Sequence, residues 1–304
     1  MIVRVLGSAA GGGVPQWNCG CANCAAARAG RAPRRTQSAV AVSPDGDRWL
    51  LLNCSPDVAA QIEAYAPLQP RTTRSTPLCG VLLTDANVDH LGGLAVLRQA
   101  GNHRFVVRSS AVVAQIAGAQ PAFAPFAAPP HRWVTVAPDP SCEAVDANDV
   151  VGNAIEVRVL AVPGTTPGYD GRRSVTGAVV AYELREPGSN ATLLFAPVYA
   201  GIDERLAAAI GRATVAFLDG SFYSDDELVE SGLMPKRARA LGHLPVGGPD
   251  GSLARLTALP NRPQRTIFTH LNNSNPMLDP SSDAASFVRD AGFEIAEDGL
   301  ELRT

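Results

Sequence analysis

The 304-residue sequence has no long apolar run and no cluster of basic residues, and both absences exclude classes of protein. No apolar stretch reaches the ~18 residues that a membrane-spanning helix needs. No run of Lys or Arg marks a segment that binds nucleic acid or a membrane surface, and the formal net charge is -3. The N-terminus also lacks a basic stretch followed by an apolar core. We therefore expect no signal peptide, and a cytoplasmic location.

Histidine is scarce, with five in the chain, whereas cysteine occurs six times. In a reducing compartment these cysteines are expected to be thiols or metal ligands rather than disulfides. Three of them cluster in "QWNCGCANC", a spacing typical of a tight structural zinc site: Cys19, Cys21 and Cys24. A fourth ligand must come from elsewhere, and His243 and Asn273 are the candidates. The others stand in apolar surroundings and are predicted to be small core residues: Cys54, Cys79 and Cys142.

Short apolar stretches of strand-like composition recur along the chain, and many are bounded by Gly, Pro, Asn or Asp. We expect strands at 2–6, 39–42, 49–52, 80–83, 105–107, 133–136, 155–162, 178–184, 192–195, 214–218, 266–268 and 300–302. Helical patterns are fewer, at 58–64, 90–99, 111–116, 203–210, 225–230, 252–259 and 282–291. This pattern predicts an α/β (α+β) fold of stacked sheets flanked by helices, in one domain.

The stretch "LLTDANVDHLGG" (residues 82–93) ends a predicted strand and opens a predicted helix. It presents Asp85, Asn87, Asp89 and His90 within six positions. The free amides and the dipole of a helix N-terminus make such a turn a natural binding place. For the Asp-His pair alone, a helix cap with an orienting hydrogen bond is the alternative.

Two distant residues favour a metal site. Asp219 and His270 each end an apolar strand, and sheet proteins build rigid sites from the ends of separate strands. Two histidines with one or two carboxylates match a non-haem Fe(II) site with open positions. They fit a hydrolytic zinc or manganese site less well. His243, in a loop, is a candidate acid or base beside the metal.

Three motifs carry a family resemblance. "GSAAGGGVPQWNCGCANC", "TDANVDHLGGL" and "FTHLNNSNP" resemble those of the PqqB family, metallo-β-lactamase-like proteins of pyrroloquinoline quinone (PQQ) biosynthesis. The resemblance implies an αββα sandwich of two mixed sheets with metals at one edge. The usual superfamily turn is H-x-H-x-D-H, and here Asp85 and Asn87 replace its first two histidines. The next usual histidine falls on Thr165 or Thr166 and the bridging aspartate near Pro197, which argues against a dinuclear zinc hydrolase.

The resemblance also implies a function. Its members look like iron-dependent hydroxylases that add oxygen to the tyrosine ring of a glutamate–tyrosine (Glu-Tyr) precursor. An alternative from another class is a carrier that moves PQQ or its precursor to the periplasm, and a third is a metal-dependent hydrolase. It further implies one metallo-β-lactamase-like domain over residues 1–304, with a zinc-binding loop at about 19–24.

We assign roles accordingly. Active-site Fe²⁺, for which other divalent metals could substitute, is expected on Asp89, His90 and His270, with Asp219 as fourth ligand. Structural Zn²⁺ is expected on the three clustered cysteines and Asn273. The groups expected to orient ligands or move protons are Asp85, Asn87 and His243.

Arg172 and Arg173 are candidates to pair with substrate carboxylates, with solvated loop charges as the alternative. The expected ligand is a small molecule or short peptide: Glu-Tyr, a PQQ precursor or PQQ. Other proteins of the PQQ pathway and a second copy of the chain are candidate partners. Neither a nucleic acid nor a membrane segment is expected.

Overall fold

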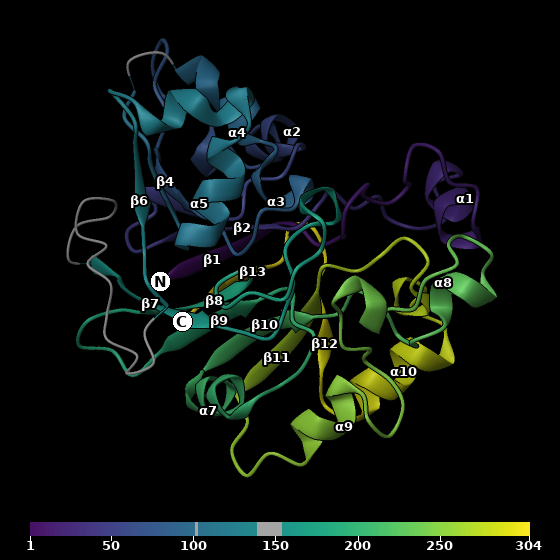
Figure 1. Cartoon of the computed structure of the whole chain (residues 1–304). Coiled ribbons are helices and arrows are strands. Elements are labelled where there is room, and N and C mark those ends of the chain that lie inside the picture. The colour runs from purple at the N-terminus through teal and green to yellow at the C-terminus, as the bar shows by residue number, and fades with distance from the viewer. Residues whose placement is uncertain (101–102, 139–153) are drawn as a thin grey trace.

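Two β-sheets pack face to face between helices in the computed structural model, which describes residues 1–100, 103–138 and 154–304 (Figure 1). Cys142, predicted to be a core residue, lies outside these ranges. Helices α2 to α5 cover one outer face, and α7, α9 and α10 cover the other (Figure 1). The predicted layered α/β fold is therefore confirmed.

The first sheet has the strand order β13-β1-β2-β3-β4-β5-β6 and mixes antiparallel with parallel pairs. Its strands are β1 (Ile2–Gly7), β2 (Ala39–Ser43), β3 (Trp49–Leu52), β4 (Leu78–Leu82), β5 (Val106–Ser109), β6 (Arg132–Thr135) and β13 (Glu301–Arg303). The second sheet has the order β12-β11-β10-β9-β8-β7 and is also mixed. Its strands are β7 (Glu156–Ala161), β8 (Val180–Arg185), β9 (Thr192–Ala196), β10 (Val215–Asp219), β11 (Arg265–Thr269) and β12 (Glu294–Ile295).

Side-chain alternation along the strands builds three apolar layers. In β3, Leu50 and Leu52 face the layer between the sheets, whereas Leu51 packs under the helices of the first sheet. In β9, Phe195 faces the central layer and Leu194 faces the helices of the second sheet. Both strands are buried on both faces, because successive side chains point to opposite sides of a strand.

The helices are short. The α-helices are α1 (Ala22–Arg28), α2 (Val58–Glu63), α3 (Val88–Leu91), α4 (Leu94–Leu97), α5 (Ala111–Gly118), α7 (Glu204–Arg212), α8 (Glu227–Glu230), α9 (Ser252–Thr257) and α10 (Asp283–Asp290). The 3-10 helices are η1 (Ala66–Leu68), η2 (Arg98–Ala100), η3 (Pro121–Ala127), η5 (Gly168–Asp170), η6 (Arg239–Leu241) and η7 (Pro276–Leu278).

The helix predicted at 90–99 is wrong in its extent, because the chain forms α3, a two-residue turn and then α4. Gly93 N–H donates to the Cys54 carbonyl at 2.9 Å instead of continuing the helical ladder. A Cβ at Gly93 would also lie 2.8 Å from the Cys54 sulfur, so the glycine permits a close backbone approach. Helix α1 and the two-residue β12 were not predicted.

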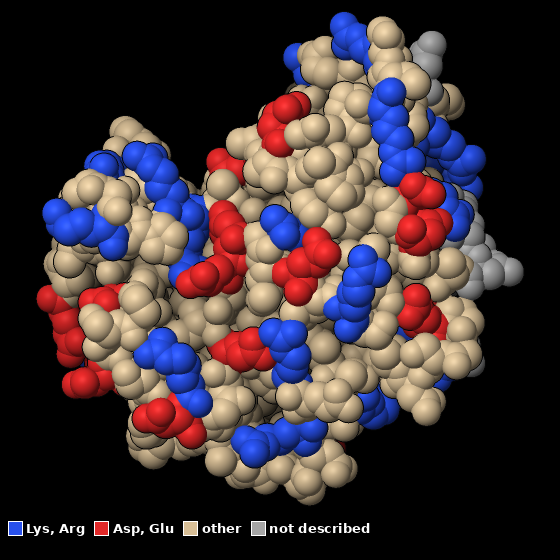
Figure 2. Space-filling view, turned by 180° about the vertical axis from the view of Figure 1, so that it is seen from behind, with Lys and Arg blue, Asp and Glu red and all other residues tan. Residues whose placement is uncertain are grey.

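The molecular surface seen from behind carries both charge signs side by side (Figure 2). Lys and Arg alternate with Asp and Glu there, as expected for a chain with a formal net charge of -3. Within the described part of the chain, no helix combines the length and the apolar character needed to cross a membrane.

We predict that Phe195→Ala destabilises the fold by about 3–5 kcal/mol, because removal of a fully buried aromatic ring leaves a cavity between the sheets. Urea unfolding followed by circular dichroism measures the change. Phe287→Ala is the matched control, since Phe287 is 58% exposed. Equal losses in the two variants would contradict the assignment of the central layer.

Candidate metal centre

The predicted active-site residues meet where strands of both sheets end. Asp85 follows β4, and Asp219 ends β10. His270 follows β11, which pairs in parallel with β10 and sets Asp219 opposite Thr269. A cavity of about 180 Å³ opens at this edge, and Asp89 and His270 are among its lining residues. The sequence therefore delivers side chains from distant segments to one place.

Asp89, His90 and His270 form the first group of potential metal ligands. One ligand atom from each lies within 4.8 Å of the others. An oxygen of Asp89 is 3.1 Å from Nε2 of His270 and 3.8 Å from Nε2 of His90. The two imidazole rings meet edge to face with their centroids 4.9 Å apart. Three of the four predicted ligands are thus brought together.

The protein fixes which ring nitrogen of each histidine faces this group. Nδ1 of His90 lies 2.6 Å from the Asp85 carboxylate, and Nδ1 of His270 lies 2.7 Å from Oγ of Ser221. With their Nδ1 atoms held there, both rings direct Nε2 toward Asp89, and each Nε2 would offer its lone pair to a metal ion once its proton is lost. Nε2 of His90 is fully buried and has no hydrogen-bond partner among the residues that the structure describes. A divalent cation would satisfy this atom, so the residues fit a metal.

Electrostatics in the metal-free site favour a cation. Burial would raise the pKa of Asp89, but the positive charge of His90 and a hydrogen bond with His270 lower it overall. Burial likewise opposes the charged form of His90, yet Asp85 and Asp89 raise its pKa to about 9. The buried carboxylates therefore hold protons on imidazole, which a metal ion would displace.

The fourth predicted ligand, Asp219, lies in a second group that shares His270: Asp219, His243 and His270. One Asp219 oxygen is 2.8 Å from Nδ1 of His243, and the other accepts a hydrogen bond from Ser221 Oγ at 2.6 Å. Burial would raise the pKa of Asp219, but His243 lowers it. Ligation of a metal by Asp219 stays a prediction, because its oxygens are engaged by these partners.

The backbone around the first group is closely fitted. His270 has φ 60, a left-handed conformation that is uncommon for a residue with a Cβ. Such strain is typically kept at functional positions. Across the cavity, a Cβ at Gly11 would lie 3.3 Å from the Asp89 carboxylate. Residues 10 and 11 thus line the cavity, and Gly11 leaves room for the Asp89 carboxylate.

The other predicted residues divide between the cavity and its surroundings. Asn87 lines the cavity and donates from its side chain to Asp85 at 2.8 Å. Arg172 also lines it, and its guanidinium donates to the Leu241 carbonyl at 2.7 Å. Arg173 instead pairs with Asp170 at the surface, with its side chain 59% exposed. The structure therefore places only the first arginine at the cavity.

Thr165 and Thr166, where the resemblance led us to expect the next usual histidine, also line the cavity. Sequence reasoning missed Ser221, which lies two residues after Asp219 and contacts both His243 and His270. Its place just after a strand end was the available signal. Tyr169 was also missed. Its hydroxyl donates to the Ala86 carbonyl and so holds the turn that carries Asp85 and Asn87.

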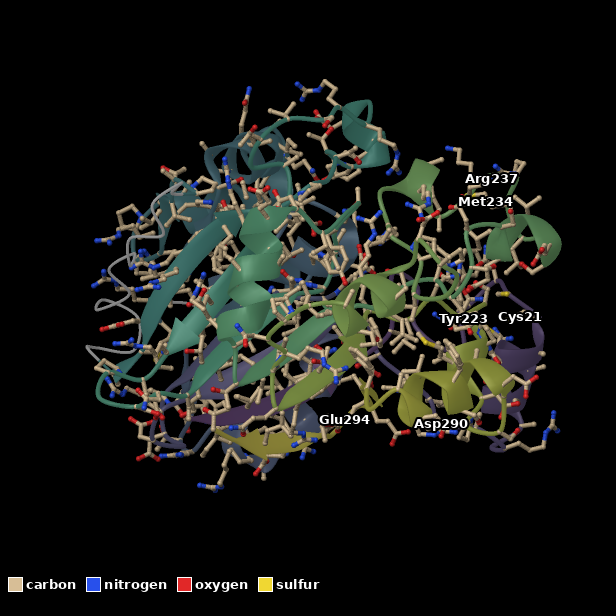
Figure 3. All side chains as sticks on the ribbon, turned by 90° about the horizontal axis from the view of Figure 1, so that it is seen from below. Cys21, Tyr223, Met234, Arg237, Asp290 and Glu294 are labelled. Atoms are coloured by element: carbon tan, nitrogen blue, oxygen red, sulfur yellow. The ribbon has the colours of Figure 1, made fainter. Side chains whose placement is uncertain are left out.

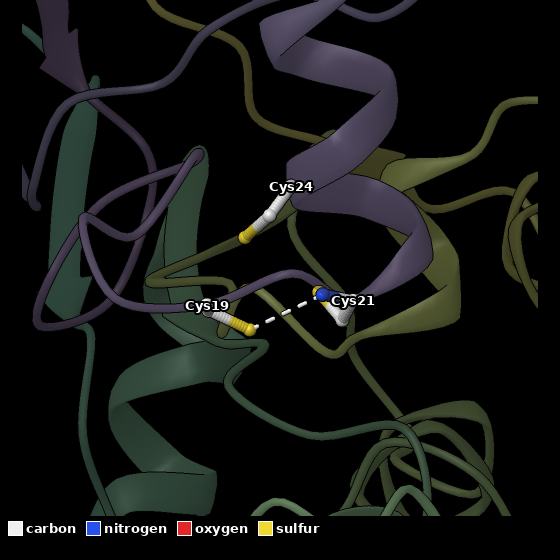
Figure 4. Close-up of side chains that lie close together, drawn as sticks. All are labelled: Cys19, Cys21 and Cys24. Atoms are coloured by element: carbon white, nitrogen blue, oxygen red, sulfur yellow. Dashed lines mark hydrogen bonds between the residues drawn. The ribbon is translucent and has the colours of Figure 1, made fainter.

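The three clustered cysteines lie at the start of α1, with their sulfur atoms within 4.8 Å of one another (Figure 4). Burial raises the pKa of the Cys24 thiol to about 11, and neighbouring Cys21 adds to the effect. A bound cation would therefore be needed to hold three thiolates together. The side-chain amide of Asn273 lies 3.1 Å from the Cys19 sulfur and 3.5 Å from the other two.

Of the two candidates for a fourth zinc ligand, the structure thus brings Asn273 to the cysteines. His243 lies instead beside Asp219. Cys54 is fully buried, and Cys79 is partly buried against the central apolar layer.

Comparison with known proteins agrees with this geometry. Residues 48–271 match the model of the beta-lactamase superfamily domain. Coenzyme PQQ synthesis protein B of Rhizobium meliloti is 38% identical over 309 residues, covering 99% of this chain and 97% of the relative. The chain belongs to the PqqB family. Coenzyme PQQ synthesis protein B of Methylorubrum extorquens is 37% identical, with 99% of both chains covered.

A solved structure also places the chain in this family. Zn²⁺-bound PqqB from Methylobacterium extorquens has a TM-score of 0.92 at 35% identity, and the match covers 100% of both chains. A diphosphatase of the PhnP family has a TM-score of 0.68 at 19% identity over 99% of this chain and 96% of its own. The second likeness shows the shared metallo-β-lactamase fold alone.

We predict two separable metal sites. His270→Ala should lose the metal held by the first group and keep zinc on the cysteines, whereas Cys21→Ser should lose the zinc. Elemental analysis of protein loaded with Zn²⁺ and Fe²⁺ under anaerobic conditions measures both metals. His103→Ala is the control, because His103 contacts the Leu78 carbonyl away from both clusters. Loss of both metals in His270→Ala would contradict separate sites.

We also predict that the metal-free protein loses stability as pH rises from about 6.5 to 9. The pKa of His90 is higher in the folded state than in the unfolded state. Protonated His90 therefore stabilises the fold fully below its unfolded pKa of about 6.5, and this stabilisation is lost as pH rises through its folded pKa of about 9. The loss is on the order of 3 kcal/mol in the free energy of unfolding. Urea unfolding across this range should show a shallower slope for Asp85→Asn. An unchanged slope in Asp85→Asn would contradict the assignment of the raised His90 pKa to its pairing with Asp85.

Proposed function

We propose that this chain acts in PQQ biosynthesis as an Fe(II)-dependent, O2-using hydroxylase of the tyrosine ring of a Glu-Tyr precursor. The observation that carries the proposal is the buried Nε2 of His90, which has no hydrogen-bond partner in the described part of the chain. It lies beside Asp89 and His270, which both line the cavity. Two imidazoles and one carboxylate are the donor set of non-haem Fe(II) oxygenases. The names of the PqqB relatives support the pathway.

The site residues predicted from the sequence have the following proposed tasks. Asp89, His90 and His270 would hold iron, which would supply the activation of O2. Asp85 and Ser221 orient the two rings through Nδ1.

Proton transfer and substrate binding fall to other cavity residues. His243, whose Nδ1 is held by Asp219, can exchange a proton at Nε2. Arg172 would pair with a substrate carboxylate. Asn273 would complete the structural zinc site.

The test is oxygen incorporation. Protein loaded anaerobically with Fe(II) is mixed with Glu-Tyr, O2 and a two-electron reductant. One oxygen atom enters the ring and the other leaves as water, so we expect a mass gain of one oxygen in the peptide. In His270→Ala this product should fall at least ~100-fold, while the zinc content is retained.

Each contrary outcome supports a different function. No product from the iron-loaded protein, together with tight binding of PQQ, would support a carrier. Hydrolysis of esters or phosphodiesters by the zinc-loaded protein would support a hydrolase. His103→Ala serves again as control and should hydroxylate at the wild-type rate.

A further inference from the structure

A chain of three polar side chains runs from the cavity wall to a buried carboxyl group. Asn272 lines the cavity and donates from Nδ2 to Oγ of Ser274. Ser274 donates in turn to Oε1 of Glu227 at 2.5 Å. Asn272 and Ser274 belong to the loop after β11, and Glu227 begins α8. None of these residues has a task in the proposed hydroxylation.

Glu227 is only 7% exposed, and hydrogen bonds to both of its carboxylate oxygens fix its position. Its second oxygen accepts the backbone N–H of Tyr223 at 2.7 Å. Tyr223 lies at the same end of the molecule as Cys21 (Figure 3). Burial raises the pKa of Glu227 to about 7, so the group is mostly ionised at pH 8. Because it accepts hydrogen bonds from both sides, this buried carboxylate is a rigid anchor for the hydrogen bonds of Ser274 and Asn272.

The ionised carboxylate sets the direction of every hydrogen bond in this chain. A carboxylate only accepts, so Ser274 must give its single hydroxyl proton to Glu227. Oγ of Ser274 is then left as an acceptor, and Asn272 must turn its NH₂ group toward it. Oδ1, to which no protein group within the described ranges is bonded, is then the atom of the amide left free to accept a hydrogen bond from a ligand.

We infer that Asn272 is a specificity-determining residue that accepts a hydrogen bond from an N–H or O–H group of the ligand, and that Ser274 and Glu227 are positioning residues that hold its carbonyl toward the cavity. The inference deepens the proposed function and rests on it for the substrate class. A Glu-Tyr peptide offers an ammonium, a peptide N–H and a phenol O–H. A ligand without such a donor would leave the fixed carbonyl unpaired.

The test compares ligand binding at pH 8 under anaerobic conditions, where no turnover occurs. Isothermal titration calorimetry measures the Kd of Glu-Tyr and of its N-acetyl and O-methyl forms. We expect one blocked form to bind wild type about 10-fold more weakly than Glu-Tyr. Ser274→Ala and Glu227→Gln should raise the Kd of Glu-Tyr by a similar factor and shrink this discrimination, because the amide is then free to turn.

Turnover separates positioning from structural damage. With iron, O2 and reductant, Ser274→Ala should raise KM about 10-fold and leave kcat within about twofold, since the hydrogen bonds of the Ser274 hydroxyl go to Asn272 and Glu227 and not to the proposed iron ligands. Glu230→Gln is the matched control, because Glu230 is an exposed residue of the same short helix. If Glu227→Gln fails to fold, Ser274→Ala alone decides. An unchanged Kd and discrimination in Ser274→Ala would overturn the inference.

Failure of the proposed function gives a different pattern. If Glu-Tyr does not bind wild type but PQQ does, the hydroxylase proposal fails. The same variants are then compared with PQQ and with PQQ methylated at its pyrrole N–H. Weaker PQQ binding by Ser274→Ala, with less discrimination against the methylated form, would support the role of Asn272. If neither Glu-Tyr nor PQQ binds wild type, the inference is overturned.

Discussion

The hydrogen bond between Asp85 and Nδ1 of His90 is the constraint on which the metal centre depends. Both side chains are fully buried, so the bond cannot be exchanged for water without opening the core. It fixes the orientation of the imidazole and directs Nε2 toward Asp89, 3.8 Å away. The Asp85 carboxylate thus supports a candidate metal ligand, because it holds the ring of His90 through Nδ1.

A second support of the same kind holds His270. Ser221 lies between this ring and the Asp219–His243 pair, so one hydroxyl touches both groups of potential ligands. His270 is thus shared: Nε2 faces Asp89, and Nδ1 faces Ser221. A change of charge on either side would be felt by the other through a single aromatic ring. This coupling makes the edge of the two sheets one electrostatic unit rather than two independent clusters.

The fold was largely predictable because strands that are buried on both faces, such as β9, consist of short apolar runs that can be seen in the sequence. The break between α3 and α4 was not, because it depends on Gly93 approaching Cys54, a contact between distant segments. Asp89, His90 and His270 were recognisable by residue type at strand ends. Ser221 was not, since serine is common after strands and only the tertiary fold shows what it touches.

The separation of the candidate metal ligands along the sequence has a consequence for the synthesis of the protein itself. Asp89 and His270 lie 181 positions apart, and His270 directly follows a strand of the sheet that forms from the second half. During translation the first two ligands emerge long before the third. Until the later strands have emerged, the nascent chain therefore offers a metal ion only part of this set of candidate donors.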